Sequence, residues 1–430
     1  MSPILQGVTM NQRTEAASAT RREWMRRTAL AGGAGALSAL VGGPAAGQQT
    51  APAEMPPWMR TPGGPDQAYG QPAASEASVL RSFPDEGAGF PTWHTPLAAL
   101  RGTITPSGLH FAVHHNGVPT IDPGRHRLVV HGRVERPMQW DLERLLRYPM
   151  VSRMAFIECS GNSAANAMAP FAKDWDLQRL SGQVSCSEWT GVPVAWLLRE
   201  AGVRPDASWA IAEGADAGSH QRSIPVAKLM DDAMIALFQN GERVRPSQGY
   251  PMRLLLPGWE GNAQVKWLHR LELTDQPAHS KDEAGLYTEV LADGRIERMS
   301  FTMEVKSVIV RPSGQQRLPA QHGLMEIEGL AWSGRGRITR VEVSVDGGRQ
   351  WMDARLHGPS LPQSFVRFSV PWAWQGRPAT LMSRAHDETG AVQPSRSTWK
   401  SRYAAHSFNH YNAVQAWAIG SDGRVENTYA

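Results

Sequence analysis

The sequence predicts an α+β domain over residues 96–300, followed by an all-β sandwich of immunoglobulin type over residues 301–430. In the first region, short runs with strand character mix with short runs of helical periodicity. After about residue 300 the helical periodicity ends, and strand-like runs recur at short intervals with turn signals between them. The 430 residues, 41% hydrophobic and 20% charged, have the composition of a globular protein with two or three cores.

The first 47 residues have the layout of a signal peptide. The pair Arg21-Arg22 precedes an aromatic and an apolar residue, a short stretch rich in alanine and glycine follows over residues 28–41, and small residues occupy positions 44–47. Consecutive arginines at this place resemble the twin-arginine export signal, a route that carries folded proteins. We therefore expect a twin-arginine signal peptide over residues 1–47 and a periplasmic protein.

A membrane-anchoring or amphipathic helix is the alternative for this segment. Its apolar part is too short to span a bilayer and too rich in glycine, so we expect no stable membrane span. Residues 48–95 are rich in Pro, Gly, Ala, Gln and Ser, with a few scattered aromatic residues. This composition predicts an extended N-terminal arm that lies on another surface.

Charge and cysteine content exclude several classes of protein. The formal net charge is +4, but residues 1–47 carry most of it, with five arginines against two glutamates. The rest of the chain is close to neutral and has no basic stripe, so nucleic acid is not an expected partner. Two cysteines, Cys159 and Cys186, are too few for a disulfide framework or a four-cysteine metal site. A single disulfide or a single thiolate ligand remains open.

The α+β region contains recognisable strands and helices. A helix is expected over Pro193–Ala201, because proline occupies its first turn and Gly202 follows its end. No glycine-rich loop follows a strand at the spacing of a phosphate-binding or dinucleotide-binding motif. A second helix is expected over Val226–Met234, and strands are expected over Arg127–Gly132, Met154–Cys159, Met252–Leu256 and Val265–Leu273.

The region after residue 300 has the pattern of a β-sandwich. Valines alternate with polar residues over positions 340–345, and the Asp-Gly-Gly run at 346–348 predicts a turn. Further strands are expected over Phe365–Val370 and Ala379–His386. About 100 residues with short strands at this spacing fit an immunoglobulin-type sandwich.

Cys159 ends the apolar run Phe156-Ile157 and begins a loop of small polar residues. A strand-to-loop junction presents a side chain on a rigid support, which suits a metal ligand or a nucleophile. The residues alone leave three readings for Cys159: a buried apolar residue, a disulfide with Cys186, or a thiolate nucleophile or ligand. Gly161 lets the backbone approach a bulky group, and a soft thiolate suits a transition metal better than calcium or magnesium.

Four motifs in order resemble the sulfite oxidase superfamily of molybdenum enzymes, and most closely the molybdenum subunits of the sulfane dehydrogenases of thiosulfate-oxidising systems. The resemblance implies a molybdopterin-binding domain followed by a dimerisation domain. It also implies that Cys159 ligates molybdenum beside the dithiolene of a pyranopterin. The motifs are Ile157-Glu158-Cys159-Ser160-Gly161-Asn162, Ser187-Glu188-Trp189-Thr190-Gly191-Val192-Pro193, Gly249-Tyr250-Pro251-Met252-Arg253 and Val265-Lys266-Trp267-Leu268.

The resemblance assigns roles to individual positions. Arg253 and Lys266 match the basic pair that holds the pterin phosphate, which needs charge-assisted hydrogen bonds when buried. Gln248 stands where several relatives have histidine, and His115 matches a histidine that contacts the pterin. Tyr287 corresponds to the active-site tyrosine, although its local sequence differs from that of the small sulfite oxidases.

Two departures bear on the substrate. Enzymes that act on free sulfite place arginines at positions that fall here on Val113 and Ala164. A pocket without those charges binds a small dianion poorly. This favours sulfane sulfur on a carrier protein, whose remote contacts supply binding energy. Arg222 is expected to supply a replacement cation near the mouth of the pocket.

The electrons are expected to pass to a separate c-type cytochrome subunit, because the chain has no haem-attachment Cys-x-x-Cys-His motif. The resemblance also implies a homodimer of this chain within a heterotetramer, with Cys186 buried and free. Three alternatives stay open: a dehydrogenase of free sulfite, an exported β-sandwich binding protein without redox activity, and a thiol hydrolase that uses Cys159 with His114 or His115.

Overall fold

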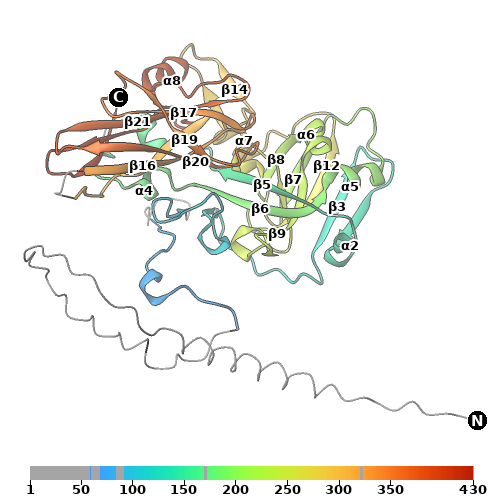
Figure 1. Ribbon diagram of the computed structural model, residues 1–430. Helices are drawn as coiled ribbons and strands as arrows, with labels where there is room; N and C mark the ends of the chain where they lie inside the picture. Colours follow the sequence, from blue (N-terminus) through green and yellow to red (C-terminus); the bar gives the residue numbers. More distant parts are fainter. Residues whose placement is uncertain (1–58, 60–67, 84–91, 169–171, 320–322, 430) are drawn as a thin grey trace, which may run out of the picture. The chain divides into compact units, whose positions relative to one another are not determined.

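The computed structural model describes residue 59 and residues 68–83, 92–168, 172–319 and 323–429 (Figure 1). The predicted signal peptide and most of the predicted arm lie outside these residues. Residues 72–430 form one compact unit, to which the elements below belong. Within the described part of the chain, no helix is long and apolar enough to cross a membrane.

A five-stranded sheet carries Cys159. Its strand order is β10-β9-β6-β5, and β11 also pairs with β9. Strand β5 pairs with β6 along its whole length, with Phe156 opposite Cys186, and ends one residue before Cys159. The predicted strand-to-loop junction is therefore confirmed. The strands are β5 Val151–Glu158, β6 Val184–Pro193, β9 Met234–Gln239, β10 Glu242–Arg243 and β11 Arg253–Leu255.

A second five-stranded sheet has the order β4-β3-β12-β7-β8. Strand β12 pairs parallel with β3 and antiparallel with β7. It begins at Leu268 instead of the expected Val265, because Trp267 has a positive φ of 53° that no strand residue adopts. The strands are β3 Arg127–Gly132, β4 Met138–Asp141, β7 Trp209–Gly214, β8 Gln221–Pro225 and β12 Leu268–Thr274, and a separate pair is β1 Thr92–Trp93 with β2 Ala112–Val113.

Three of the short helices that follow, α5, α6 and α2, pack against these two sheets and share their apolar core. Helix α5 runs over Val194–Ala201 as expected, with Gly202 in the left-handed region at its end. Helix α6 ends at Asp231, so the expected continuation to Met234 is wrong: Met234 begins β9 and pairs with both β6 and β11. The other helices here are α2 Leu142–Leu146, α3 Ala164–Met168, α4 Leu177–Ser181 and α7 Lys281–Gly285, with 3-10 turns at Ala74–Glu76, Ser107–Leu109, Pro246–Gln248 and Gly261–Ala263.

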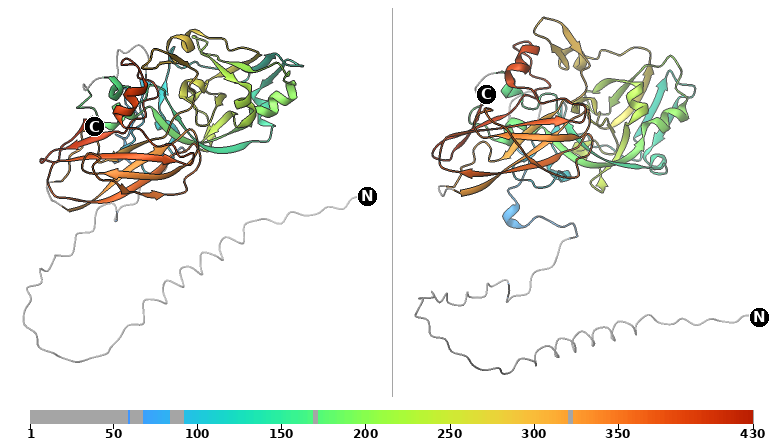
Figure 2. Two further views of the ribbon diagram at one scale, coloured as in Figure 1. Left: turned by 90° about the horizontal axis from the view of Figure 1, so that it is seen from above. Right: turned by 45° about the horizontal axis from the view of Figure 1, so that its top comes forward.

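The C-terminal region is the expected β-sandwich, and Figure 2 shows its two sheets, orange to red, stacked on each other. One helix, α8 Arg396–Arg402, contradicts the prediction that helical structure ends at residue 300. One sheet has the order β15-β16-β20-β19 and the other β18-β17-β21-β22-β23. The strands are β15 Lys306–Arg311, β16 Gly323–Trp332, β17 Ile338–Ser344, β18 Met352–Asp353, β19 Arg355–His357, β20 Val366–Trp374, β21 Ala379–Asp387, β22 Ala416–Ile419 and β23 Val425–Thr428, and the hairpin β13 Thr288–Val290 with β14 Ile296–Arg298 precedes them.

One apolar core runs from the sheet that carries Cys159 into the sandwich, and joins Phe156 and Cys186 to sandwich residues. A buried polar cluster crosses at the same place. The Glu158 carboxylate accepts hydrogen bonds from Lys306 Nζ at 2.9 Å and Trp332 Nε1 at 2.6 Å. The residue beside Cys159 is therefore fixed by β15 and β16. The division of the chain at residue 300 remains a prediction.

Candidate active site

Cys159 directly follows β5 and begins a tight turn that backbone hydrogen bonds hold in place. Its N–H donates to the Gln183 carbonyl at 3.0 Å, and its carbonyl accepts from the Asn162 N–H at 3.0 Å. A Cβ at Gly161 would lie 4.0 Å from the Cys159 sulfur, so glycine leaves the space beside the thiol open. Burial raises the pKa of Cys159 to about 11, and the acidic neighbours Glu260 and Glu158 add to this effect. A thiol in this environment needs a bound cation to become a thiolate.

Cys159 lines a pocket of about 750 Å³, counting the space open to solvent. The walls come from β2 and the residues on either side of it, the end of β5, the β7–β8 loop, the segment 248–267, and the residues after α7. Six of the seven predicted site residues meet here. The lining residues named by the prediction are His115, Cys159, Gln248, Arg253, Lys266 and Tyr287.

Arg253, which is buried, and Lys266, which is partly buried, form a pair of cations. Arg253 donates to the Gln248 carbonyl at 3.0 Å and the Gln264 carbonyl at 3.1 Å, while its Nε has no partner in the described structure. Lys266 Nζ donates to the Val113 carbonyl at 2.8 Å. Burial lowers the pKa of Arg253 to about 9, and burial together with Arg253 holds the pKa of Lys266 well below its usual value. Two cations held by carbonyl oxygens, with an N–H to spare, suit an anion such as a phosphate.

Gln248 positions Arg253. Its side-chain oxygen accepts from Arg253 at 3.3 Å, and its side-chain nitrogen donates to the Phe111 carbonyl at 2.8 Å. A neutral amide can therefore stand where relatives have histidine without adding a third buried charge.

His114 and His115, which lie next to this pair of cations, are neutral and take part in the pocket as uncharged imidazoles. His114 Nδ1 accepts from Lys266 Nζ at 2.8 Å, and burial with that charge lowers the pKa of His114 to about 3. His115 meets the His220 ring edge-on, with centroids 5.6 Å apart, and burial and His220 lower its pKa. A thiol hydrolase needs an imidazolium that lowers the cysteine pKa. The raised pKa of Cys159 and neutral histidines count against that alternative.

Tyr287 faces the pocket two residues after α7, and burial raises the pKa of its phenol, so that it stays a proton donor. Arg222 does not lie at the mouth as expected. It is 1% exposed, pairs with Glu260 at 2.9 Å and Glu283 at 3.3 Å, and holds its guanidinium carbon 4.7 Å from the Tyr287 ring centroid. The buried carboxylates of Glu260 and Glu283 neutralise its charge. Arg222 therefore packs against the Tyr287 ring and does not serve as a free cation in the pocket.

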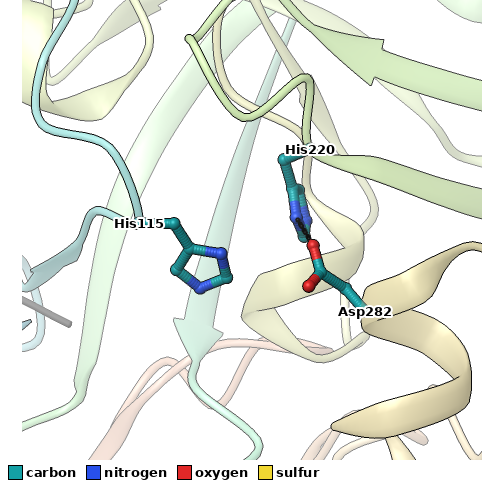
Figure 3. Close-up of side chains that lie close together, drawn as sticks. All are labelled: His115, His220 and Asp282. Atoms are coloured by element: carbon teal, nitrogen blue, oxygen red, sulfur yellow. Dashed lines mark hydrogen bonds and ion pairs between the residues drawn. The ribbon is translucent and has the colours of Figure 1, made fainter. Parts of the chain in front are cut away.

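The prediction missed five polar residues that line the pocket: His110, Asp216, His220, Asn262 and Gln264. Figure 3 shows His220 and Asp282 in contact, with His115 facing them. The loop before β8 carries His220 two residues from Arg222, so its closeness to a residue already singled out was the available signal. The ring of His220 has its partners, Asp282 and Asn262, 62 and 42 residues away in sequence, so they leave no local pattern.

The two apolar residues that stand where sulfite enzymes are expected to have arginines lie in different places. Val113 lines the pocket, while Ala164 begins α3 and is not among the lining residues.

Cys186 is fully buried and free, as expected, with its sulfur 3.4 Å from Ser364 Oγ.

The chain is similar to known molybdenum enzymes over both regions. Residues 115–281 match the oxidoreductase molybdopterin binding domain, and residues 297–416 match the Mo-co oxidoreductase dimerisation domain. The crystal structure of the sulfane dehydrogenase SoxCD from Paracoccus pantotrophus is 41% identical, with a TM-score of 0.84, and the match covers 88% of this chain and 98% of that one.

Curated relatives include the NADH nitrate reductases of Ulva prolifera and Solanum lycopersicum, each 30% identical. These matches cover 69% and 71% of this chain but only 39% and 38% of the relatives. The chain therefore spans well under half the length of these enzymes. Fold, pocket and matches together define a molybdopterin oxidoreductase. The chain belongs to the sulfite oxidase family, whose cofactor is molybdenum bound to molybdopterin.

The pocket fits this cofactor. The unpartnered Arg253 Nε and the cation pair suit its phosphate, and the open space beside Gly161 leaves room at the Cys159 sulfur. His110 Nε2, also without a partner in the described structure, lines the same pocket.

Proposed function

We propose that this protein oxidises sulfane sulfur held on a carrier protein and passes the electrons to a c-type cytochrome subunit. The similarity to SoxCD supports this reading, because that match is longer and closer than the matches to nitrate reductases. The single observation that carries the substrate assignment is the pocket wall. Among the lining residues in the described structure, Arg253 is the one arginine, and Val113 is apolar.

The charges in the pocket support a carrier-bound substrate. Arg253 and Lys266 are expected to bind the cofactor phosphate, which leaves no arginine for a small free dianion. A substrate attached to a carrier gains binding energy from contacts outside the pocket. The reacting end then needs little charge recognition of its own.

We assign the residues as follows. Cys159 holds the metal, Arg253, Lys266, Gln248 and His115 hold the pterin, and Tyr287 donates a hydrogen bond to the substrate or product oxygen. The bound molybdenum cofactor supplies two-electron oxidation of sulfur with oxygen that derives from water. The chain's own part is to exclude bulk water, orient the sulfur and move protons.

Partners and location belong to the same proposal. The match to a dimerisation domain supports a homodimer of this chain, and the cytochrome subunit and the sulfur carrier would complete the assembly. Export by the twin-arginine route is proposed from the sequence of residues 1–47.

The test compares substrates with the holoenzyme and a c-type cytochrome as acceptor. We expect carrier-bound sulfane sulfur to give a kcat/KM at least about tenfold above that of free sulfite. Nitrate with a reduced donor should give no turnover. A higher kcat/KM with free sulfite would establish the main alternative, a sulfite dehydrogenase, and sink the proposal.

A gain-of-charge variant sharpens this test. Val113→Arg should raise kcat/KM for free sulfite by about tenfold or more and lower it for the carrier-bound substrate. Val118→Arg is the matched control, because Val118 is 43% exposed on the segment that follows β2 and does not line the pocket. Equal effects of the two variants would show that general charge, and not the pocket wall, decides the substrate.

A further inference from the structure

Three side chains from distant parts of the sequence meet beside the cofactor pocket. His115 follows β2, His220 precedes β8, and Asp282 lies on α7 (Figure 3). One nitrogen or oxygen atom of each lies within 4.8 Å of the others. His115 and His220 line the pocket and Asp282 does not, and the side chains of His220 and Asp282 are 18% and 25% exposed. The cluster therefore runs from the pocket toward solvent.

The contacts of His220 fix its hydrogens. Nε2 lies 2.8 Å from the Asn262 carbonyl oxygen, and Nδ1 lies 3.2 Å from Asp282 Oδ2. A carbonyl and a carboxylate can only accept hydrogen bonds. Nε2 must therefore carry one hydrogen, and a second proton must lie between Nδ1 and the carboxylate. That second proton is shared by a base and an acid at the edge of solvent, so it can leave and be replaced.

Charged groups surround this proton. Asp216 Oδ1 accepts a hydrogen bond from the backbone N–H of His220 at 3.2 Å, Lys266 acts on His115, and Lys281 acts on Asp282. The hydrogen bond from His220 lowers the pKa of Asp282, and burial lowers the pKa of His115. Lowered pKa values mean that His115 and Asp282 release a proton readily once they have received it.

We propose that His115, His220 and Asp282 form the outlet for the protons that sulfur oxidation releases into the pocket. This rests on the proposed function for its source of protons. A carrier persulfide RSS⁻ and three water molecules give RSSO3⁻, six protons and six electrons. The sulfur is oxidised, and the electrons reduce the one-electron haem acceptor. Each two-electron step therefore leaves two protons that must leave the pocket.

The exposure of the Asp282 side chain sets the direction in which the proton moves. A proton taken up by His115 passes to the His220–Asp282 pair, across a gap that one water molecule can bridge. Asp282 then releases a proton to solvent, and His220 keeps its Nε2 hydrogen on Asn262 throughout. Tyr287, whose pKa burial raises, stays protonated and does not compete for this role.

The experiment measures turnover and its solvent isotope effect in the holoenzyme. Asp282→Asn should lower kcat by about tenfold to hundredfold, leave KM within about twofold and increase the solvent isotope effect. Asp282→Glu, which keeps the carboxylate, should retain most of the activity. His220→Ala should recover turnover when imidazole is added, in proportion to the free base present. A purely structural role would not produce that rescue.

His269→Gln is the matched control. His269 Nε2 lies 2.8 Å from Glu213, so it forms a similar histidine–carboxylate pair, but neither residue lines the pocket. It should leave kcat and the isotope effect unchanged. Unchanged kcat and isotope effect in Asp282→Asn with full molybdenum content would overturn the proposal. So would one zinc ion per chain in the wild type that is lost in Asp282→Asn, because a metal would then replace the shared proton.

Failure of the proposed function would look different. In that case the wild type would not oxidise carrier-bound sulfane sulfur at all. The outlet would then be tested with free sulfite, whose oxidation by water releases two protons in each turnover, and the same variants should lose kcat. Variants that match the wild type on both substrates would refute the outlet itself.

Discussion

Lys306→Met should destabilise the protein far more than an exposed ion-pair mutation, because it leaves the Glu158 carboxylate buried without its cation. The Glu158 and Lys306 side chains are 1% and 4% exposed and lie 2.9 Å apart. Breaking one side of a buried pair costs about 3–5 kcal/mol. Hydrogen bonds from Asn162 at 2.9 Å and Trp332 at 2.6 Å still reach the carboxylate, which places the expected loss at about 3 kcal/mol.

The reverse change should cost more. Glu158→Gln leaves the Lys306 ammonium with Ser163 Oγ at 3.1 Å and the Asn162 carbonyl at 3.5 Å, so we expect about 4–5 kcal/mol. The double variant Glu158→Gln/Lys306→Met removes both charges and should lose no more than about 2 kcal/mol. Each single variant would then lose more stability than the double variant.

Urea unfolding followed by tryptophan fluorescence measures these differences, with midpoints compared at a constant slope. Glu304→Gln is the control. The Glu304 and Arg335 side chains are 28% and 48% exposed, so their ion pair should contribute less than about 1 kcal/mol to stability. A loss below about 1 kcal/mol in Lys306→Met, or a double variant as unstable as the sum of the singles, would refute the reasoning.

Three further predictions concern the site. Cys159→Ser should abolish turnover and change the paramagnetic spectrum of molybdenum while the fold remains, as circular dichroism would check. Arg253→Met and Lys266→Met should each weaken cofactor retention by about tenfold to hundredfold, measured as molybdenum per chain, and full retention in either would contradict the phosphate assignment. Burial opposes the charge on His410, but its hydrogen bond to Glu260 outweighs this and raises the pKa above 6.5. This stabilisation should be full below pH 6.5 and lost as pH rises through the raised value, and His410→Gln should remove that pH dependence of unfolding.

Features set by local sequence could be predicted. Pro193 and Gly202 bracket α5, and the apolar run before Cys159 gives the strand and its end. The motif resemblance located six pocket residues, because those residues lie within or near recognisable segments. The helix over Val226–Met234 was overestimated, since apolar periodicity alone cannot reveal that Met234 pairs with two strands.

Tertiary contacts explain what the sequence could not reveal. Arg222 is charged and lies near a motif, but its partners Glu260 and Glu283 are 38 and 61 residues away. Only folding shows that they enclose it. His220, two residues earlier, reaches the pocket because it precedes β8, where neither periodicity nor composition distinguishes it from a surface histidine.

The hydrogen bond from the His410 N–H to the Ser160 carbonyl, at 2.8 Å, has a consequence for biosynthesis. His410 also contacts Glu260, so a late segment of the chain holds the loop that follows Cys159. The ribosome makes this loop long before it makes His410. A growing chain therefore presents an incompletely held loop after Cys159, and translation must reach the end of the sandwich before the loop takes its final form. Cofactor loading would thus depend on synthesis of this late segment.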